Sequence, residues 1–220
     1  MPNSVRPVLL GSLLACASCF SMIRDPARRF YVLHVASQGQ SYAAATSDAN
    51  RPRAGEAMVR VRDLDCESAY DKFQMVVRKS PFELVYRNKD VWAVKPGHMV
   101  SDLFARGLQE RRLFGGVTRE LGERRPDWLI SGDLHAIEIE QMQSDWRAHL
   151  AFTLQASNVD SGDIAWSGRF EEHEPVPSHD YGDAAEAMSR ALERAMQQAF
   201  ASLAERPLGV LTTEAGRTEP

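Results

Sequence analysis

The residues with the clearest chemical signal lie near the start of the chain. The stretch LLACASC (13–19) places two thiols, Cys16 and Cys19, three positions apart at the end of the apolar run PVLLGSLLA. Arg6 and the amino terminus are the only positive charges before this run. The run is far shorter than the roughly 20 apolar residues needed to span a bilayer. A short basic region, a short apolar region and small residues are typical of an export signal.

Leu13 stands three residues before Cys16 and the small Ala15 directly before it, which resembles a bacterial lipobox. In such a motif the cysteine sulfur receives a diacylglyceryl group before cleavage. We therefore predict a lipoprotein signal peptide at 1–15, lipidation of Cys16 and a membrane tether at 16–28. Ala17, rather than Asp, after the cysteine favours the outer membrane and a position on the periplasmic side of the envelope.

Two other interpretations of this stretch remain. It could form a buried amino-terminal helix, or Cys16 and Cys19 could form a redox or metal pair, although no second ligand pair accompanies them. Export would leave Cys19 and Cys66 as the free thiols in an oxidising compartment, where they could pair. We interpret Cys66 as a small buried residue.

The six histidines give no recognised catalytic or metal motif. None forms an H-E-x-x-H helical pair, and the chain has no G-x-S-x-G sequence. The segment HEPVPSHD (173–180) is interpreted as a solvated loop, so we predict no metal site and no cofactor.

One acidic cluster supports a rival hypothesis, a periplasmic hydrolase. In SGDLHAIEIEQ (131–141), strand alternation sends Asp133 and His135 to one side and Glu138 and Glu140 to the other, unless a bulge intervenes. Because no catalytic group assembles without that bulge, we expect a protein that is not an enzyme. A cleft around His135 and Glu138 would favour the hydrolase.

Charge excludes one class of partner. The chain has 26 basic and 30 acidic residues and a net charge of −4, so we expect no binding to nucleic acid, which requires a basic face.

The first half of the chain is predicted to form mainly β-strands. We predict strands at 28–35 and 58–64, and two more within 73–94, separated by Ser80-Pro81 and followed by a polar turn at 87–90. The segment 36–57 is rich in Ser, Gly, Pro and Asn and is predicted to be a loop or linker. These strands are expected to form a meander.

Helical and alternating patterns follow. Amphipathic helices are predicted at 98–111 and 183–205, and strands at 128–142, 147–157 and 164–172. A bulge near His135 would reconcile the two halves of the first of these strands. The other two form a hairpin, whose inward side chains should face the second helix: Leu150, Phe152, Trp166 and Phe170. We thus predict an α+β fold at 29–205, an antiparallel sheet with two helices on one face, and a loose tail at 206–220.

With these elements in place, the chain resembles the ABC-type transport auxiliary lipoproteins, the group that includes the lipoprotein of the paraquat-inducible intermembrane system. The most specific part is 78–96, where Arg78, Ser80-Pro81 and Tyr86 form an R-x-S-P-y-E-l-x-Y pattern. Trp92-Ala93 and Pro96 then form W-A-x-x-P at the start of a helix. The likeness extends over about 29–203.

The resemblance implies an accessory subunit of a lipid-transporting ABC system. Its partners would be an MCE-type substrate-binding protein and the ABC permease. The lipid anchor would attach it to the membrane, and a homo-oligomer is a further possibility. Arg78, Tyr86 and Trp92 are the residues that would either organise the sheet or contribute to a docking surface. A lipid carrier, with a cavity between sheet and helices, is a further alternative.

Overall fold

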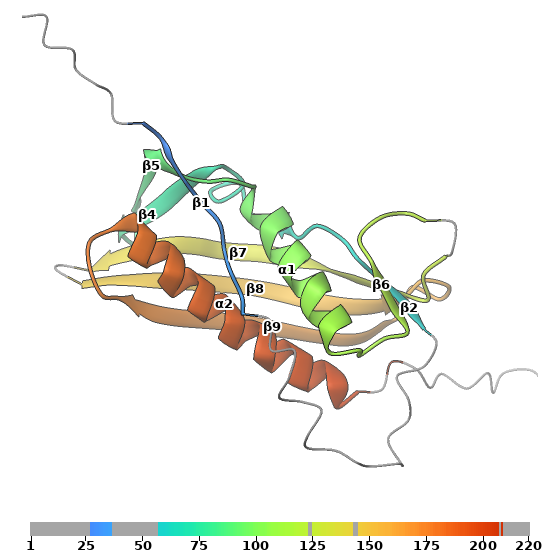
Figure 1. The fold of residues 1–220 in the computed structure, drawn as a ribbon. Helices are drawn as coiled ribbons and strands as arrows, with labels where there is room; N and C mark the ends of the chain where they lie inside the picture. The colour runs from blue at the N-terminus through green and yellow to red at the C-terminus, as the bar shows by residue number, and fades with distance from the viewer. Residues whose placement is uncertain (1–26, 37–56, 123–124, 143–144, 207, 209–220) are drawn as a thin grey trace, which may run out of the picture.

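The computed structural model describes residues 27–36, 57–122, 125–142, 145–206 and 208. These residues form one nine-stranded sheet and two helices (Figure 1). The fold is α+β, as predicted. The predicted lipidation of Cys16 and the predicted signal peptide lie outside the described residues, as do most of the tether, of the 36–57 segment and of the tail at 206–220.

Three long strands form the centre of the sheet. β7 (Trp128–Met142), β8 (Asp145–Asn158) and β9 (Ile164–Val176) pair antiparallel in chain order. The first two match the predicted strands closely, and 158–163 forms the expected hairpin connection, with Gly162 at a φ of 78°. β9 continues four residues beyond the prediction, so His173 lies on a strand and not in a loop. Pro175 is tolerated there because β9 pairs only with β8 and is an edge strand.

The expectation of an antiparallel sheet is wrong for the other side of β7. Three short strands pair with it in series and in parallel: β2 (Met58–Val61), β3 (Asp65–Cys66) and β4 (Gln74–Ser80). The 15-residue β7 is long enough to offer each of them a separate stretch. A meander requires each strand to pair antiparallel with the one before it. Because β2, β3 and β4 all run in the same direction beside β7, the predicted meander does not form.

The remaining strands complete the two ends of the sheet. β5 (Glu83–Trp92) forms an antiparallel hairpin with β4, and β1 (Arg29–Tyr31) pairs parallel to β5. β6 (Gly116–Thr118) pairs parallel to β2. The polar turn predicted at 87–90 is absent: these residues continue β5 between its pairings with β4 and β1. The β4–β5 pairing has a register shift there, and within the strand Asn88 and Lys89 are exposed whereas Asp90 is buried.

Helices α1 (Pro96–Glu110) and α2 (Tyr181–Ala204) lie on the same face of the sheet, as predicted (Figure 1). Pro96 occupies the first turn of α1, and the Asp180 side chain caps α2 by accepting a hydrogen bond from the Gly182 amide. The helices meet where the rings of Phe104 and Phe200 stack 4.9 Å apart. Gly107 is required at this contact, since a Cβ there would lie 2.6 Å from the Phe200 ring.

The predicted inward face of the β8–β9 hairpin is buried beneath α2: Leu150, Phe152, Trp166 and Phe170. The indole nitrogen of Trp166 donates a hydrogen bond to Ser202 of α2, with the two atoms 3.1 Å apart. This confirms the pairing and its register. Neither described helix is long and apolar enough to cross a membrane.

Candidate functional site

A bulge in β7 gathers the acidic cluster on one face. Leu134 pairs with Phe152 and Ala136 with Ala151, so His135 is the extra residue between them. The bulge shifts the alternation by one, and Glu138 and Glu140 join Asp133 and His135 on the same side. This is the bulge expected near His135.

That side is the outer face of the sheet, opposite the helices. On β9, Glu172 and Glu174 form ion pairs with Arg194 and Arg190 of α2. His173 lies between them in sequence and therefore points away from the helices. His149 of β8 is its direct cross-strand partner, so both histidines lie on the outer face.

Glu138 is a buried charged group on this face, with 2% of its surface exposed. One carboxylate oxygen accepts a hydrogen bond from the Arg78 Nε atom and the other from the Tyr70 hydroxyl, each at 2.6 Å. Arg78 also donates to the Tyr70 hydroxyl at 2.8 Å, which closes a three-membered network. Tyr70, which lies between β3 and β4, was not singled out from the sequence.

The network fixes the protonation of its members. Burial alone would raise the pKa of Glu138, but hydrogen bonds from His149, Arg78 and Tyr70 outweigh it and lower that pKa to about 2. Burial and the bond to Glu138 raise the pKa of Tyr70. Glu138 therefore stays ionised and Tyr70 protonated at neutral pH, so neither is poised for general acid or base catalysis.

His149 extends this network along the sheet. Its Nδ1 atom lies 3.3 Å from Glu138 Oε1, and its Nε2 atom 3.1 Å from Glu171 Oε1. The imidazole stacks on that of His173, with ring centroids 4.3 Å apart and planes at 6°. Burial alone would lower the pKa of His149, but the facing carboxylates raise it.

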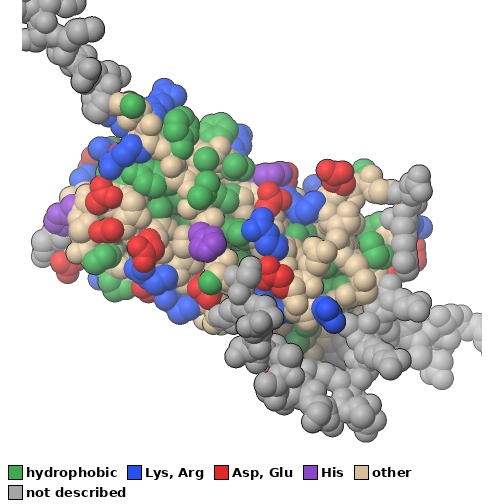
Figure 2. Space-filling view, in the orientation of Figure 1, with side chains coloured by type: hydrophobic (Ala, Val, Ile, Leu, Met, Phe, Trp, Pro, Cys, Tyr) green, Lys and Arg blue, Asp and Glu red, His purple; other side chains and the backbone are tan. Residues whose placement is uncertain are grey.

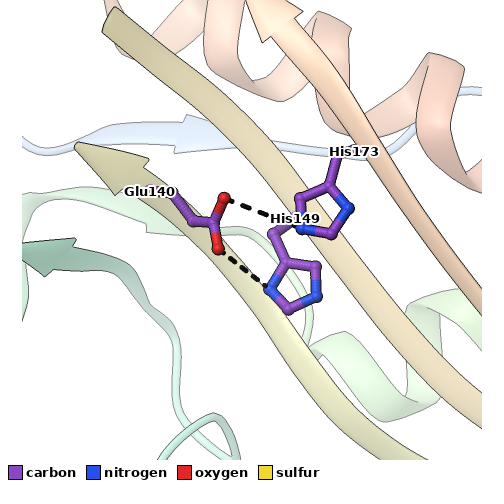
Figure 3. A group of neighbouring side chains, drawn as sticks. All are labelled: Glu140, His149 and His173. Atoms are coloured by element: carbon purple, nitrogen blue, oxygen red, sulfur yellow. Dashed lines mark ion pairs between the residues drawn. The ribbon is translucent and has the colours of Figure 1, made fainter. Parts of the chain in front are cut away.

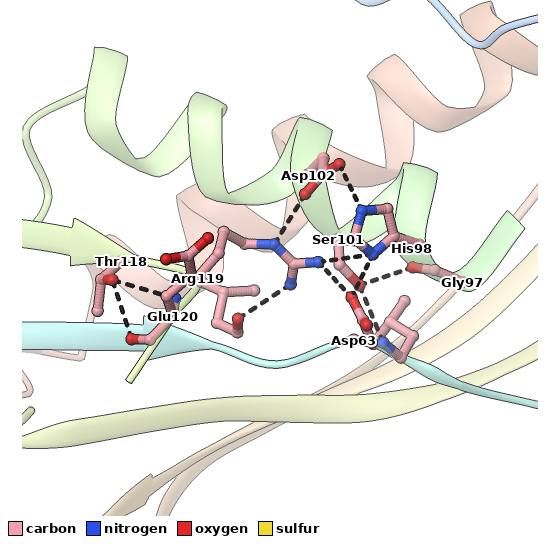
Figure 4. A network of polar contacts seen from close by, with 10 residues as sticks. Asp63, Gly97, His98, Ser101, Asp102, Thr118, Arg119 and Glu120 are labelled. Atoms are coloured by element: carbon pink, nitrogen blue, oxygen red, sulfur yellow. Dashed lines mark hydrogen bonds and ion pairs between the residues drawn. The ribbon is translucent and has the colours of Figure 1, made fainter. Parts of the chain in front are cut away.

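A second polar network ties α1 to the sheet (Figure 4). His98 bridges Asp63, at 2.9 Å, and Asp102, at 3.2 Å. Arg119 forms ion pairs with the same two carboxylates and donates to the Val61 carbonyl oxygen at 2.9 Å. This arrangement clamps the segment after β6 onto the start of α1.

Two further side chains could act as nucleophiles by their chemistry, Ser101 and Cys66, but neither is available in this structure. Ser101 donates to the Gly97 carbonyl oxygen at 2.7 Å and accepts from the Leu64 amide at 2.9 Å. Burial raises the pKa of the Cys66 thiol to about 12, which keeps it protonated.

The three residues singled out by the family pattern occupy different environments. Trp92 is 3% exposed and lies in the core. Arg78 is half-buried in the Glu138 network. Tyr86 is 40% exposed, with the Lys72 ammonium 4.5 Å from its ring centre. The structure does not bring these three residues together at one surface.

Sequence reasoning missed a set of exposed apolar side chains along the β1–β5 edge of the sheet. We call it the apolar end; it lies on β1, β5 and the segments next to them and comprises Phe30, Val32, Phe73, Phe82, Tyr86 and Val94. Phe82, in the β4–β5 turn, is 99% exposed, and Phe30 on β1 is 67% exposed. Figure 2 shows hydrophobic side chains gathered on this end of the molecule. Only the tertiary structure reveals this set of side chains, because β1 lies beside β5 through a parallel pairing of segments far apart in the sequence.

The space between the sheet and α2 is filled. The hollow among Met75, Trp92, Ile137 and Met188 is too small to hold a water molecule, with a volume of about 0 Å³. An open hollow of about 340 Å³ lies over β7, β8 and β9. It is lined by Asp133, Thr153 and Arg169, among others, and not by His135 or Glu138.

Solved structures share this fold at low sequence identity. A Xanthomonas campestris protein of family DUF330 is 19% identical with a TM-score of 0.64, over 78% of this chain and 92% of that chain. An uncharacterized protein is 9% identical with a TM-score of 0.60, over 79% and 96%. A hypothetical protein from Chlamydia trachomatis is 6% identical with a TM-score of 0.50, over 70% and 99%.

None of the curated proteins matches the chain. The model of a protein family does: the ABC-type transport auxiliary lipoprotein component matches residues 38–200, most of the chain. The match includes the Arg78 to Pro96 pattern, both helices and the three long strands. The chain therefore belongs to the family of ABC-type transport auxiliary lipoproteins.

Proposed function

We propose that this protein is a non-catalytic accessory subunit of an ABC system that moves lipid between membranes. It would work beside an MCE-type substrate-binding protein and the ABC permease. The family match over residues 38–200 carries the proposal, because it makes the chain an envelope lipoprotein associated with ABC transport. Cys16 would hold it to the periplasmic side of the envelope, with the outer membrane favoured.

The interactions of the buried carboxylate, the serine hydroxyl and the cysteine thiol support a non-catalytic role. Glu138 is buried in an ion pair, Ser101 is hydrogen-bonded on both sides, and the Cys66 thiol is protonated. A hydrolase would need an unengaged nucleophile beside a base. The filled space under α2 argues against a carrier that encloses acyl chains.

The apolar end is the surface that we propose for docking the MCE-type partner. Exposed aromatic side chains are costly in water and are enriched at the centres of protein interfaces. Among the described strands, β1 is also the edge strand on this side of the sheet, and an edge strand can pair with a strand of a partner.

Affinity purification tests the proposal. The tagged full chain, solubilised from native membranes in detergent, should retain an MCE-domain protein and an ABC permease. The double variant Phe30→Ser/Phe82→Ser should lose them. Ile164→Ser is the matched control, because Ile164, the first residue of β9 beside the β8–β9 turn, is 59% exposed. Equal retention by all three proteins would contradict docking at the apolar end.

A genetic experiment tests the pathway separately. Deleting this gene, the partner genes, or both should give equal defects in outer-membrane permeability. Additive defects would contradict a shared pathway. Hydrolysis by the purified protein that is lost on changing His135 or Glu138 would overturn the non-catalytic role.

A further inference from the structure

Three side chains from three adjacent strands converge on the outer face of the sheet (Figure 3). The carboxylate of Glu140 on β7 faces the stacked imidazoles of His149 on β8 and His173 on β9. One oxygen is 3.8 Å from His149 Nδ1 and the other 3.7 Å from His173 Nε2. Both distances are too long for a good hydrogen bond, so the carboxylate faces the two nitrogen atoms without binding either tightly.

These are the atoms that a zinc-type ion uses. Imidazole nitrogen and carboxylate oxygen bind such ions at about 2.0–2.2 Å, which places tetrahedral ligand atoms about 3.4 Å apart. The three ligand atoms here already lie within 4.8 Å of one another. Because a metal binds an imidazole nitrogen in the plane of its ring, His173 must turn out of its stack on His149 to complete the site. His173, 41% of whose side chain is exposed, has room to turn.

The neighbours of the cluster favour a cation. Glu171 accepts the Nε2 proton of His149, which leaves Nδ1 on the side of Glu138 and Glu140, 3.8 Å from the Glu140 carboxylate. A carboxylate on the second nitrogen of a metal-binding imidazole is the usual means of orienting that ring. Glu138 lies 3.3 Å from the same Nδ1 atom and adds a second negative charge close to the site.

We propose that Glu140, His149 and His173 form a binding site for a divalent transition-metal ion, with Zn²⁺ the expected occupant. The donor set contains no thiolate and suits zinc, copper or nickel more than calcium or magnesium. Any proton on His149 Nδ1 is released to solvent when the metal binds. The exposed side of His173 leaves a fourth position for water. The ion would link β7, β8 and β9, a role independent of the proposed transport function.

Calorimetry on the full chain tests this site. The protein, stripped with chelator in detergent, is titrated with zinc chloride alone. We expect one ion per chain and a rise in the melting temperature on binding. Glu140→Gln, which keeps the size of the side chain, and His173→Ala should each raise the dissociation constant at least about tenfold. Glu171→Gln, which removes the group that orients His149, should raise it about 10- to 100-fold.

His135→Ala is the matched control. His135 lies on the same face of β7 and contacts Glu67 and Thr153, away from the cluster. Unchanged binding in this variant, with weakened binding in Glu140→Gln and His173→Ala, supports the site. No binding by the unaltered chain, or equal binding by all variants, would overturn it. Circular dichroism on each variant separates loss of the site from loss of folding.

Discussion

Single side chains on the outer face of the sheet depend on one another for their charge. Glu138 is almost fully buried and keeps its charge only because Arg78, Tyr70 and His149 surround it. Removing one member of a buried pair leaves an uncompensated charge, which costs more than the pair itself contributes. The arginine of the family pattern is therefore explained by the carboxylate that it neutralises.

Arg78→Met tests this dependence. The variant should lose about 3 kcal/mol of the free energy of unfolding, because Glu138 then stays buried without its cation. Urea unfolding measures the change. The double variant Arg78→Met/Glu138→Leu should recover part of the loss, since both polar partners are gone. Arg147→Met, at an exposed position of β8, is the control and should change stability by less than about 0.5 kcal/mol. A double variant no more stable than Arg78→Met would contradict this account.

At the level of elements, α2 is held at its start by charge and along its length by apolar contact. The Asp180 carboxylate accepts hydrogen bonds from the Gly182 amide, at 2.6 Å, and from Arg29, at 3.0 Å. Arg29 also pairs with the buried Asp90 of β5, so it connects the helix to the edge of the sheet. Further along, Trp166 fixes the β8–β9 hairpin to α2.

Asp180→Ala should destabilise the protein by about 1 kcal/mol at neutral pH through loss of the helix cap. The Gly182 amide and then Arg29 lower the pKa of Asp180 in the folded protein. Stability from this charge is therefore present above the unfolded pKa and is lost as the pH falls through the folded pKa. The difference between the two proteins should shrink on acidification, as denaturant titrations at several pH values would measure. A difference that grows below pH 4 would contradict it.

Trp166→Ala should lower the free energy of unfolding by about 3–5 kcal/mol, because a buried aromatic ring leaves a cavity. Thermal unfolding measures the shift. The matched control is Ile164→Ala, two residues earlier on β9, where the side chain is 59% exposed. Similar melting temperatures for the two variants would show that the hairpin does not pack on α2 as described.

At the level of the whole molecule, the described residues of this member of a lipoprotein family form one mixed sheet covered by helices on a single face. The covered face is filled with side chains, and the opposite face carries ion-paired polar groups. The apolar end is left exposed at one edge. The filled interior and the exposed apolar end are consistent with the proposed role in contacting partners.

Cys16→Ser tests the anchor. Because the lipobox thiol receives the lipid before cleavage, the variant should lose metabolic labelling with fatty acid and accumulate the unprocessed precursor. Cys19→Ser is the control and should be labelled and processed normally, since the residue three before Cys19 is not leucine but Cys16. Labelling of Cys16→Ser at the level of the unaltered protein would show that another residue carries the lipid.

The sequence alone determined the family, both helices and the three long strands, because these depend on local periodicity. Apolar residues at helical spacing predict α2, and the break in alternation near His135 predicts the bulge. The W-A-x-x-P pattern predicts the start of α1 at Pro96. Each signal lies within a few residues of the structure that it specifies.

Only the tertiary structure decided which strands are neighbours and which side chains meet. The parallel pairing of β2, β3 and β4 with β7 joins residues about 60 to 70 positions apart, and no local pattern encodes such contacts. The same pairing brings Arg78 to Glu138, and the β8–β9 register brings His173 to His149. Long-range pairing is stabilised by burial across the whole sheet, so its outcome depends on the packed core and not on any one segment.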